Sequence, residues 1–267
     1  MLKKRVVTAL WGIPLLVIAV WFDEPLPWFT IFMAIWGLLT AYEFYRLVGV
    51  SQIPSLTFIG MLWTLLFILS PHCNYEFTVP FLLTSAIVLS LIWLVLRPQK
   101  EGAFLGWVWT MAGILYVGWL LSYLVALRLD GGRNWVLFAL FTTFGSDTAA
   151  FFIGRALGKH HLAPKISPHK TWEGAIGGVI GAMLVSLLFV APAPLSLPLN
   201  YGQAILLALV VSVLGQFGDL AESLLKRNLG VKESGKAMPG HGGFLDRTDS
   251  VVFAGVVVYL YYIFAVL

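Results

Sequence analysis

Four polar residues near position 220 have the types and the spacing that suit binding of phosphate or a metal ion. Asp219, Glu222, Ser223 and Lys226 are spaced i, i+3, i+4 and i+7, so on a helix they form a single polar stripe. The positions between them are leucine and alanine. Ionisable groups beside an apolar span are costly and usually functional. We therefore predict a functional site here, with a structural network between helices as the alternative.

The stripe leads into a second charged segment that ends near residue 249. Its charged and polar members are Lys232, Glu233, Lys236, His241, Asp246, Arg247 and Asp249. Carboxylates with few histidines and cysteines favour a hard cation such as Mg²⁺, and neighbouring Lys and Arg side chains favour phosphate oxygens. The glycine-rich run 239–243 can bring backbone N–H groups close to an anion. Together these residues predict phosphoryl transfer on a lipid or phosphate transport.

Two other acidic residues stand in apolar stretches. Asp147 has no basic neighbour within one helical turn, so we predict that it contacts a ligand or substrate; a buried neutral carboxyl group is the alternative. Glu43 and Arg46 are three residues apart near the end of an apolar run, and this spacing predicts a local ion pair at the membrane interface.

The composition indicates that these residues belong to a membrane protein. Of the 267 residues, 59% are hydrophobic and 11% are charged, with a mean hydropathy of +0.88. A soluble domain of this size could not bury so much apolar surface, so a soluble globular enzyme is excluded. The single cysteine excludes an intramolecular disulfide. The net charge is +4, but the basic residues lie in short connectors, so we expect no nucleic acid partner.

A membrane-spanning helix needs about 20 apolar residues, and we identify nine such runs. Their approximate bounds are 6–22, 28–48, 53–70, 77–96, 103–127, 134–156, 173–193, 202–225 and 249–267. The connectors carry proline, glycine and charged residues, which break helices. The sequence therefore predicts an all-α polytopic integral membrane protein with about nine transmembrane helices.

The basic residues also predict the orientation. With nine spans and a cytoplasmic N-terminus, 15 of the 17 Lys and Arg residues fall in cytoplasmic segments, and only Arg128 and Arg133 lie outside. This asymmetry is what the positive-inside rule requires. We therefore expect the C-terminus outside and both long basic connectors, about 155–172 and 226–248, in the cytoplasm.

We expect two domains. Residues 1–130 form an N-terminal transmembrane scaffold of about five helices, and 131–267 form a catalytic transmembrane domain of about four helices with the two cytoplasmic loops. Glycines at 174, 177, 178 and 181 predict a helix that packs closely against another helix.

Two stretches resemble a known family. The ordered run from Ser223 to Asp249, which contains Lys226-Arg227 and the glycine cluster, is similar to the signature of the phosphatidate cytidylyltransferase (CDP-diacylglycerol synthase) family, and so is 147–174. The chain has Glu233 where the family usually has Asp, and His169 where many members have Lys. The resemblance covers 131–267 strongly, whereas 1–130 matches only as a pattern of spans.

The resemblance implies a reaction and a location. CTP and phosphatidate would give CDP-diacylglycerol and pyrophosphate with Mg²⁺, in phospholipid biosynthesis. The expected location is the cell (inner) membrane, with the active site facing the cytoplasm and a second cation or a homodimer compatible with such a protein. A CTP-dependent lipid-alcohol kinase and a cation or phosphate transporter remain as alternatives.

The resemblance also assigns expected roles. Asp219 and Asp246 would hold Mg²⁺ and, with Lys226 and Arg247, form the catalytic set. The residues expected to bind substrate are Asp147, Lys165, Ser167, Lys170, Ser223, Arg227, His241, Gly242, Gly243 and Asp249.

Overall fold

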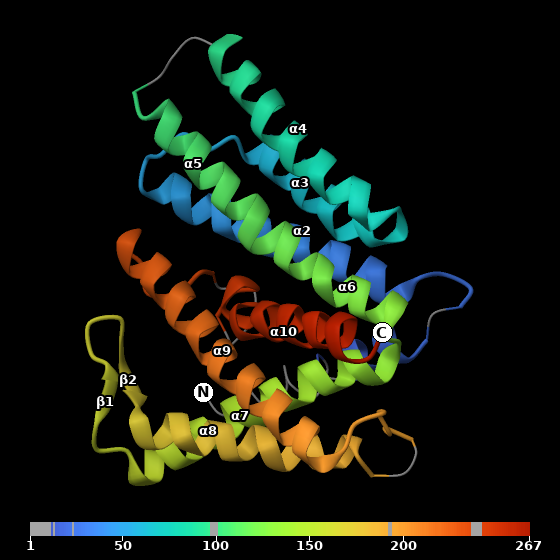
Figure 1. Ribbon diagram of the computed structural model, residues 1–267. Helices are drawn as coiled ribbons and strands as arrows, with labels where there is room; N and C mark the ends of the chain where they lie inside the picture. The colour runs from blue at the N-terminus through green and yellow to red at the C-terminus, as the bar shows by residue number, and fades with distance from the viewer. Residues whose placement is uncertain (1–11, 13, 23, 97–100, 192–193, 236–241) are drawn as a thin grey trace. The chain divides into compact units, whose positions relative to one another are not determined.

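The computed structural model (Figure 1) describes residues 12, 14–22, 24–96, 101–191, 194–235 and 242–267. Its described elements are helices apart from one two-stranded antiparallel sheet, which confirms the all-α class. Contacts between residues divide the chain into two compact units. Unit 1 is Met1–Leu129 with Lys226–Thr248, and unit 2 is Asp130–Leu225 with Asp249–Leu267.

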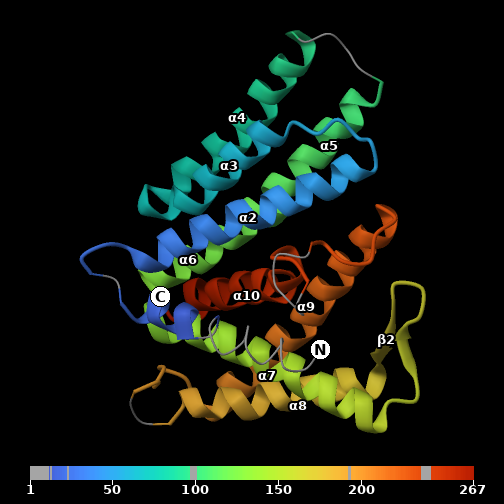
Figure 2. The same ribbon diagram turned by 180° about the vertical axis from the view of Figure 1, so that it is seen from behind.

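Unit 1 is built from the first long helices and the second basic connector. Its elements are α2 (Trp28–Val50), α3 (Thr57–Leu69), the 3₁₀ turn η1 (Ser70–His72), α4 (Tyr75–Leu96), α5 (Ala103–Gly113), the π-helical η2 (Ile114–Trp119), α6 (Leu120–Asp130) and the 3₁₀ turn η4 (Leu245–Arg247). Trp63 and Phe67 of α3, Leu82 of α4 and Ile114 of η2 form an apolar core. Figure 2 shows α3 beside α4 within this unit.

Tyr45 fixes the packing of α2 inside unit 1. Its ring lies where a side chain on Gly60 or Gly113 would stand, so the absence of these side chains lets α3 and α5 approach α2 closely. Its hydroxyl donates a hydrogen bond to the carbonyl oxygen of Thr110 at 3.0 Å. Close packing through small residues is how helices associate where apolar burial gives no driving force. The result is a firmly held α2, the helix that carries Glu43.

Unit 2 contains a tightly packed helix pair and two further long helices. Its helical elements are α7 (Arg133–Leu157), α8 (Trp172–Ser186), the 3₁₀ turn η3 (Leu187–Phe189), α9 (Tyr201–Asn228) and α10 (Asp249–Ala265), and α9 continues three residues beyond the unit boundary. A side chain at Gly177 would collide with Ile153 of α7, and one at Gly181 would collide with Ala149. The predicted close contact of the glycine-rich helix is therefore confirmed.

A β-hairpin joins α7 to α8 in the first basic connector. Its strands, β1 (His161–Ala163) and β2 (Ser167–Thr171), pair antiparallel with a register irregularity. The sequence analysis predicted only a loop here. Thr171 ends the hairpin as the N-cap of α8, where its hydroxyl accepts a hydrogen bond from the Gly174 amide at 3.2 Å, as N-cap threonines commonly do.

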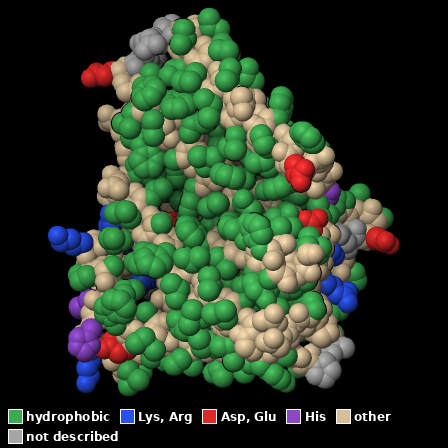
Figure 3. Space-filling view, in the orientation of Figure 1, with side chains coloured by type: hydrophobic (Ala, Val, Ile, Leu, Met, Phe, Trp, Pro, Cys, Tyr) green, Lys and Arg blue, Asp and Glu red, His purple; other side chains and the backbone are tan. Residues whose placement is uncertain are grey.

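Among the described residues, six helices are long and apolar enough to cross a membrane. They are Trp28–Val50, Tyr75–Leu96, Ala103–Asp130, Arg133–Leu157, Trp172–Phe189 and Tyr201–Asn228. Large apolar side chains such as Phe77 and Phe81 of α4 point outward, and hydrophobic side chains dominate the face in Figure 3. Such exposure is unfavourable in water and favourable in lipid. The chain is a multi-pass membrane protein.

Three of the nine predicted spans are not among the six. Thr57–His72 and Asp249–Ala265 are shorter apolar helices, and most of the run 6–22 lies outside the described residues. Pro54 precedes the α-helical part of the first, α3 (Thr57–Leu69), and Pro71 follows it in η1; both disfavour a longer α-helix, because proline lacks the backbone N–H and restricts the residue before it. The segment 226–248, expected in the catalytic half, groups with the N-terminal helices. The functional division at residue 130 remains a prediction.

Candidate active site

Asp246 lies at the centre of a hydrogen-bonded cluster in unit 1. Lys226 Nζ donates to its Oδ1 at 2.5 Å. Its Oδ2 accepts from the Ser234 amide at 3.2 Å, from the Ser234 hydroxyl at 2.8 Å and from the Gly243 amide at 2.8 Å. Both charged side chains are largely buried, with exposed fractions of 13% and 10%. The carboxylate is therefore fixed by donors before any ligand arrives. We call Lys226, Ser234, Gly243 and Asp246 the Asp246 cluster.

The local sequence explains how this cluster forms. Gly242 has a φ of +85°, a conformation that glycine adopts without strain. A side chain at this position would collide with the Asp246 carboxylate. The short helical turn η4 follows and places Asp246 over the Gly243 amide. The predicted glycine cluster thus offers an N–H group to an anion, and in this structure that anion is the carboxylate of Asp246.

A stripe of side chains on α2 contacts the segment Lys226–Thr248, which contains the Asp246 cluster. The Trp36 ring nitrogen donates to Thr248 Oγ1 at 2.9 Å, and Thr40 Oγ1 lies 3.3 Å from that atom. The Trp36 ring also meets Phe244 edge to face, with the ring centroids 4.9 Å apart. One turn further, Glu43 Oε2 accepts a hydrogen bond from the segment's backbone. Residues 36, 40 and 43 share one helix face, so α2 holds the segment along that face.

Glu43 makes contacts that the sequence analysis did not anticipate. Its Oε2 accepts a hydrogen bond from the Leu245 amide at 3.0 Å and lies 3.3 Å from the Ser234 hydroxyl. In the described part of the chain no ion pair joins Glu43 to Arg46, so the predicted local pair is wrong. Glu43 is 5% exposed and Arg46 is exposed. Burial of the carboxylate among donors from a distant segment has replaced the local partner.

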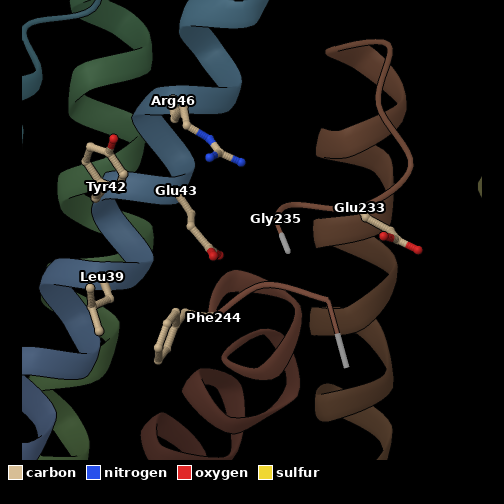
Figure 4. Close-up of a pocket in the computed structure, with 7 residues that line it drawn as sticks. All are labelled: Leu39, Tyr42, Glu43, Arg46, Glu233, Gly235 and Phe244. Atoms are coloured by element: carbon tan, nitrogen blue, oxygen red, sulfur yellow. The ribbon is translucent and has the colours of Figure 1, made fainter. Parts of the chain in front are cut away.

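A pocket of about 440 Å³ opens beside Glu43 (Figure 4). Its described lining residues are Leu39, Tyr42, Glu43, Arg46, Glu233, Gly235 and Phe244. The volume lies in the range of small-molecule sites. Figure 4 shows the Glu43 side chain reaching from α2 toward Gly235 and Phe244, so the carboxylate belongs to the contact between α2 and the segment.

A second, more open cluster surrounds Asp219 in unit 2. Lys170 of β2 forms an ion pair with Asp219 Oδ2 at 2.6 Å, with exposed fractions of 23% and 35%. The Ser223 hydroxyl donates to Oδ1 at 3.4 Å. Gly218 packs against the backbone of Asp249, where a side chain would collide. The structure thus brings Lys170, Asp219 and Ser223 into contact, and Asp249 lies beside Gly218, the residue before Asp219. We call Lys170, Asp219 and Ser223 the Asp219 cluster.

The remaining predicted residues lie on several different elements. Lys165 is exposed in the hairpin turn, and Ser167 begins β2. Asp147 is exposed on α7, and Arg227 and Arg247 are exposed near the ends of α9 and η4. His241 lies outside the described residues. The substrate contacts of these residues remain predictions.

The two carboxylates differ in how well they suit Mg²⁺. This ion is usually held by one or two carboxylates together with substrate phosphates and water. Asp219 is accessible to solvent and meets this requirement, whereas the oxygens of Asp246 already accept bonds from three residues. No group of three or more His, Cys, Asp or Glu side chains gathers within the described ranges. An accessible carboxylate such as Asp219 fits an ion that also binds phosphate oxygens and water.

The sequence matches the model of the cytidylyltransferase family over residues 3–265. The chain belongs to this family. It is similar to the phosphatidate cytidylyltransferase of Brucella suis biovar 1 (strain 1330), with 37% identity over 273 residues that cover 97% of this chain and 93% of the relative. It is also similar to the phosphatidate cytidylyltransferase of Bacillus subtilis (strain 168), with 35% identity over 244 residues that cover 89% and 88% of the two chains. Both clusters lie within residues 3–265, the region that the family model matches.

Proposed function

We propose that this chain is a phosphatidate cytidylyltransferase, which converts CTP and phosphatidate to CDP-diacylglycerol and pyrophosphate. The observation that carries the proposal is the similarity to enzymes of that name along nearly the whole chain. The residues fit the chemistry, because fixed carboxylates and lysines stand together in two clusters. A membrane protein is also suited to a lipid substrate.

In this reaction an oxygen of the lipid phosphate attacks the α-phosphorus of CTP. A new P–O bond forms, the bond between the α-phosphorus and the bridging oxygen of the β-phosphate breaks, and pyrophosphate leaves with that electron pair. Both reactants are anions, so the enzyme must offset their repulsion and align them. The lipid phosphate is already ionised near neutral pH, so no side chain needs to activate it as a base.

The described cations have distinct tasks in this proposal. Lys226, held by Asp246 at 2.5 Å, presents a fixed ammonium group to phosphate oxygens. Lys170, held by Asp219 at 2.6 Å, does the same from the hairpin. Exposed Arg227 and Arg247 suit two-point contacts with phosphate groups. The carboxylates orient the lysine side chains and keep their ammonium groups in place.

Mg²⁺ is the proposed cofactor, with Asp219 and Asp246 as its protein ligands; Asp246 would have to exchange one of its present hydrogen bonds for the ion. Each residue is described only within its own unit, so the proposal rests on carboxylate chemistry and on the family resemblance. When bound, the ion would neutralise charge on the phosphates of CTP. The proposed location is the inner membrane, with nine spans and the site at the cytoplasmic face, supported by the distribution of basic residues.

Labelled CTP tests the function directly. The purified protein in detergent is given phosphatidate, Mg²⁺ and CTP labelled either in the α-phosphate or in the γ-phosphate. A cytidylyltransferase moves the α-label into the organic phase and releases pyrophosphate. In a parallel assay with diacylglycerol, whose hydroxyl can accept a phosphoryl group, a lipid-alcohol kinase moves the γ-label instead and releases CDP, and a transporter moves neither label into lipid. Transfer of the γ-label alone, or of no label, would overturn the proposal.

A further inference from the structure

The carboxylate of Glu43 is buried in a place where a charge is expensive. Its neighbours on α2, Phe44 and Tyr45, are at most 2% exposed. One of its oxygens, Oε1, has no hydrogen-bond partner among the described residues. Removal of a carboxylate from water costs several kcal/mol unless donors replace the lost hydration. An apolar side chain would fill this position at lower cost, so packing alone does not account for a glutamate.

The other oxygen of Glu43 contacts one backbone amide and one side-chain hydroxyl next to the Asp246 carboxylate. Oε2 accepts from the amide of Leu245, the residue directly before Asp246, at 3.0 Å. It also lies 3.3 Å from the hydroxyl of Ser234, which donates to Asp246 at 2.8 Å. A hydroxyl has one hydrogen, and the shorter distance favours Asp246 as its acceptor. The Leu245 amide is therefore the principal bond, and Ser234 joins the two carboxylates.

Two glycines of the segment are shaped around the same carboxylate. A side chain on Gly235 would collide with Glu43 Oε1, and one on Gly243 would collide with Oε2. The Gly243 amide in turn donates to Asp246 at 2.8 Å. The segment thus approaches Glu43 from two directions and at van der Waals distance. The observed position of the segment depends on a hydrogen-bond acceptor at this point of α2.

We infer that Glu43 is a positioning residue of the active site: its hydrogen bond with the Leu245 amide holds η4 so that Asp246 meets Lys226. The inference rests on the proposed function for its kinetic readout. It requires a hydrogen-bond acceptor of glutamate length at position 43 and does not require the negative charge. This requirement predicts that glutamine at position 43 is tolerated better than aspartate, although aspartate keeps the charge.

Three substitutions at position 43 separate these requirements. Glu43→Gln keeps the length and keeps a carbonyl oxygen to accept from Leu245, so turnover is expected to fall less than about tenfold, the loss due to a weaker, uncharged bond. Glu43→Asp keeps the charge and is too short, and Glu43→Ala has no acceptor. Both are expected to lower kcat about 100-fold, the cost of misplacing a catalytic group by about 1 Å, while the KM for CTP changes less. Glu76→Ala, on exposed Glu76 of α4, is the matched control and is expected to keep full turnover.

Hydrogen exchange supplies a readout that is independent of activity. In detergent, the peptide that contains the Leu245 amide is expected to exchange faster in Glu43→Ala and Glu43→Asp than in the original protein and in Glu43→Gln. If the original protein does not transfer the label from CTP, the proposed function fails, and the exchange result still tests the contact. A Gln variant as inactive as the Ala variant would show that charge is needed and would overturn the inference.

Gly243→Ala tests the same arrangement from the side of the segment. Its added methyl group would collide with both the Glu43 carboxylate and the Ser234 hydroxyl and separate the segment from α2, so low kcat and fast exchange at Leu245 are expected. Gly49→Ala is the control on α2, because nothing lies within 4 Å of its added methyl group. This pair keeps the test decisive if the Glu43→Ala protein does not fold. Normal turnover and normal exchange in Gly243→Ala would overturn the inference.

Discussion

The Asp246 and Asp219 clusters use the same chemistry in different surroundings. Each joins a carboxylate to a lysine, at 2.5 Å and 2.6 Å. The first pair is nearly buried and receives three further hydrogen bonds, whereas the second is about one-quarter to one-third exposed and has one. A buried pair is rigid and intolerant of losing a partner, and an exposed pair is easily rearranged. The comparison indicates a preformed cluster in unit 1 and a cluster in unit 2 that is able to adapt to a ligand.

The largest expected difference is in stability. Lys226→Met leaves the Asp246 carboxylate buried without its cation, and we expect a loss of about 3–5 kcal/mol in the free energy of unfolding. Lys170→Met leaves Asp219 accessible to water, and we expect a loss of about 1 kcal/mol or less. Denaturant unfolding in detergent measures both. Equal losses for the two variants would remove the distinction between the clusters.

Asp219→Asn should affect turnover without affecting folding. The substitution is isosteric and removes the charge proposed to meet Mg²⁺, so we expect turnover to fall about 100-fold. Membrane insertion and thermal stability should remain close to those of the original protein. Turnover measured across a Mg²⁺ series, with the amount of inserted protein determined in parallel, checks this. Normal turnover would exclude Asp219 from metal binding.

Ser234→Ala should have an intermediate effect. It removes one hydroxyl bond to Asp246 and retains the backbone bond at 3.2 Å. A hydrogen bond to a carboxylate contributes about 1.5–3 kcal/mol, part of which the remaining donors would recover, so we expect turnover to fall about tenfold. Ser51→Ala is a suitable control, because its hydroxyl donates to the Leu229 carbonyl oxygen. Equal losses in both variants would show a general rather than a local effect.

The smallest expected difference is in the response to salt. The Lys170–Asp219 pair is partly exposed, so its coupling free energy should fall from about 0.5 kcal/mol toward zero as salt rises to about 1 M. The coupling of Lys226 with Asp246 should change little. Double-mutant cycles at low and high salt measure both couplings. A strong salt dependence of the Lys226–Asp246 pair would contradict its burial.

Local spacing predicted the parts of the site that local structure builds. The i, i+3, i+4, i+7 pattern from Asp219 to Lys226 lies on a single helix, α9, because a helical stripe depends only on neighbours along the chain. The close packing of Gly177 and Gly181 was predicted for the same reason. The number and lengths of the spans were less accurate, since prolines at 54 and 71 shorten an apolar run that hydropathy alone counts as long enough.

The role of Glu43 could not be read from local spacing. Its partner Ser234 is 191 residues away in the sequence, and the nearby Arg46 offered a simpler interpretation. A signal was nevertheless present, because Trp36, Thr40 and Glu43 form a polar stripe on a membrane helix. The hairpin was missed because its strands are only three and five residues long, and tertiary context rather than strand propensity determines such short pairs.

The 191 residues between Glu43 and Ser234 also impose an order during biosynthesis. At about 5–20 residues per second, the ribosome needs roughly 10–40 s to reach the serine after it has made the glutamate. During that interval the Glu43 carboxylate on α2 has neither the Leu245 amide nor the Ser234 hydroxyl as a partner. A protein truncated before residue 234 would therefore keep the Glu43 carboxylate permanently without the amide and the hydroxyl that contact it in the full chain.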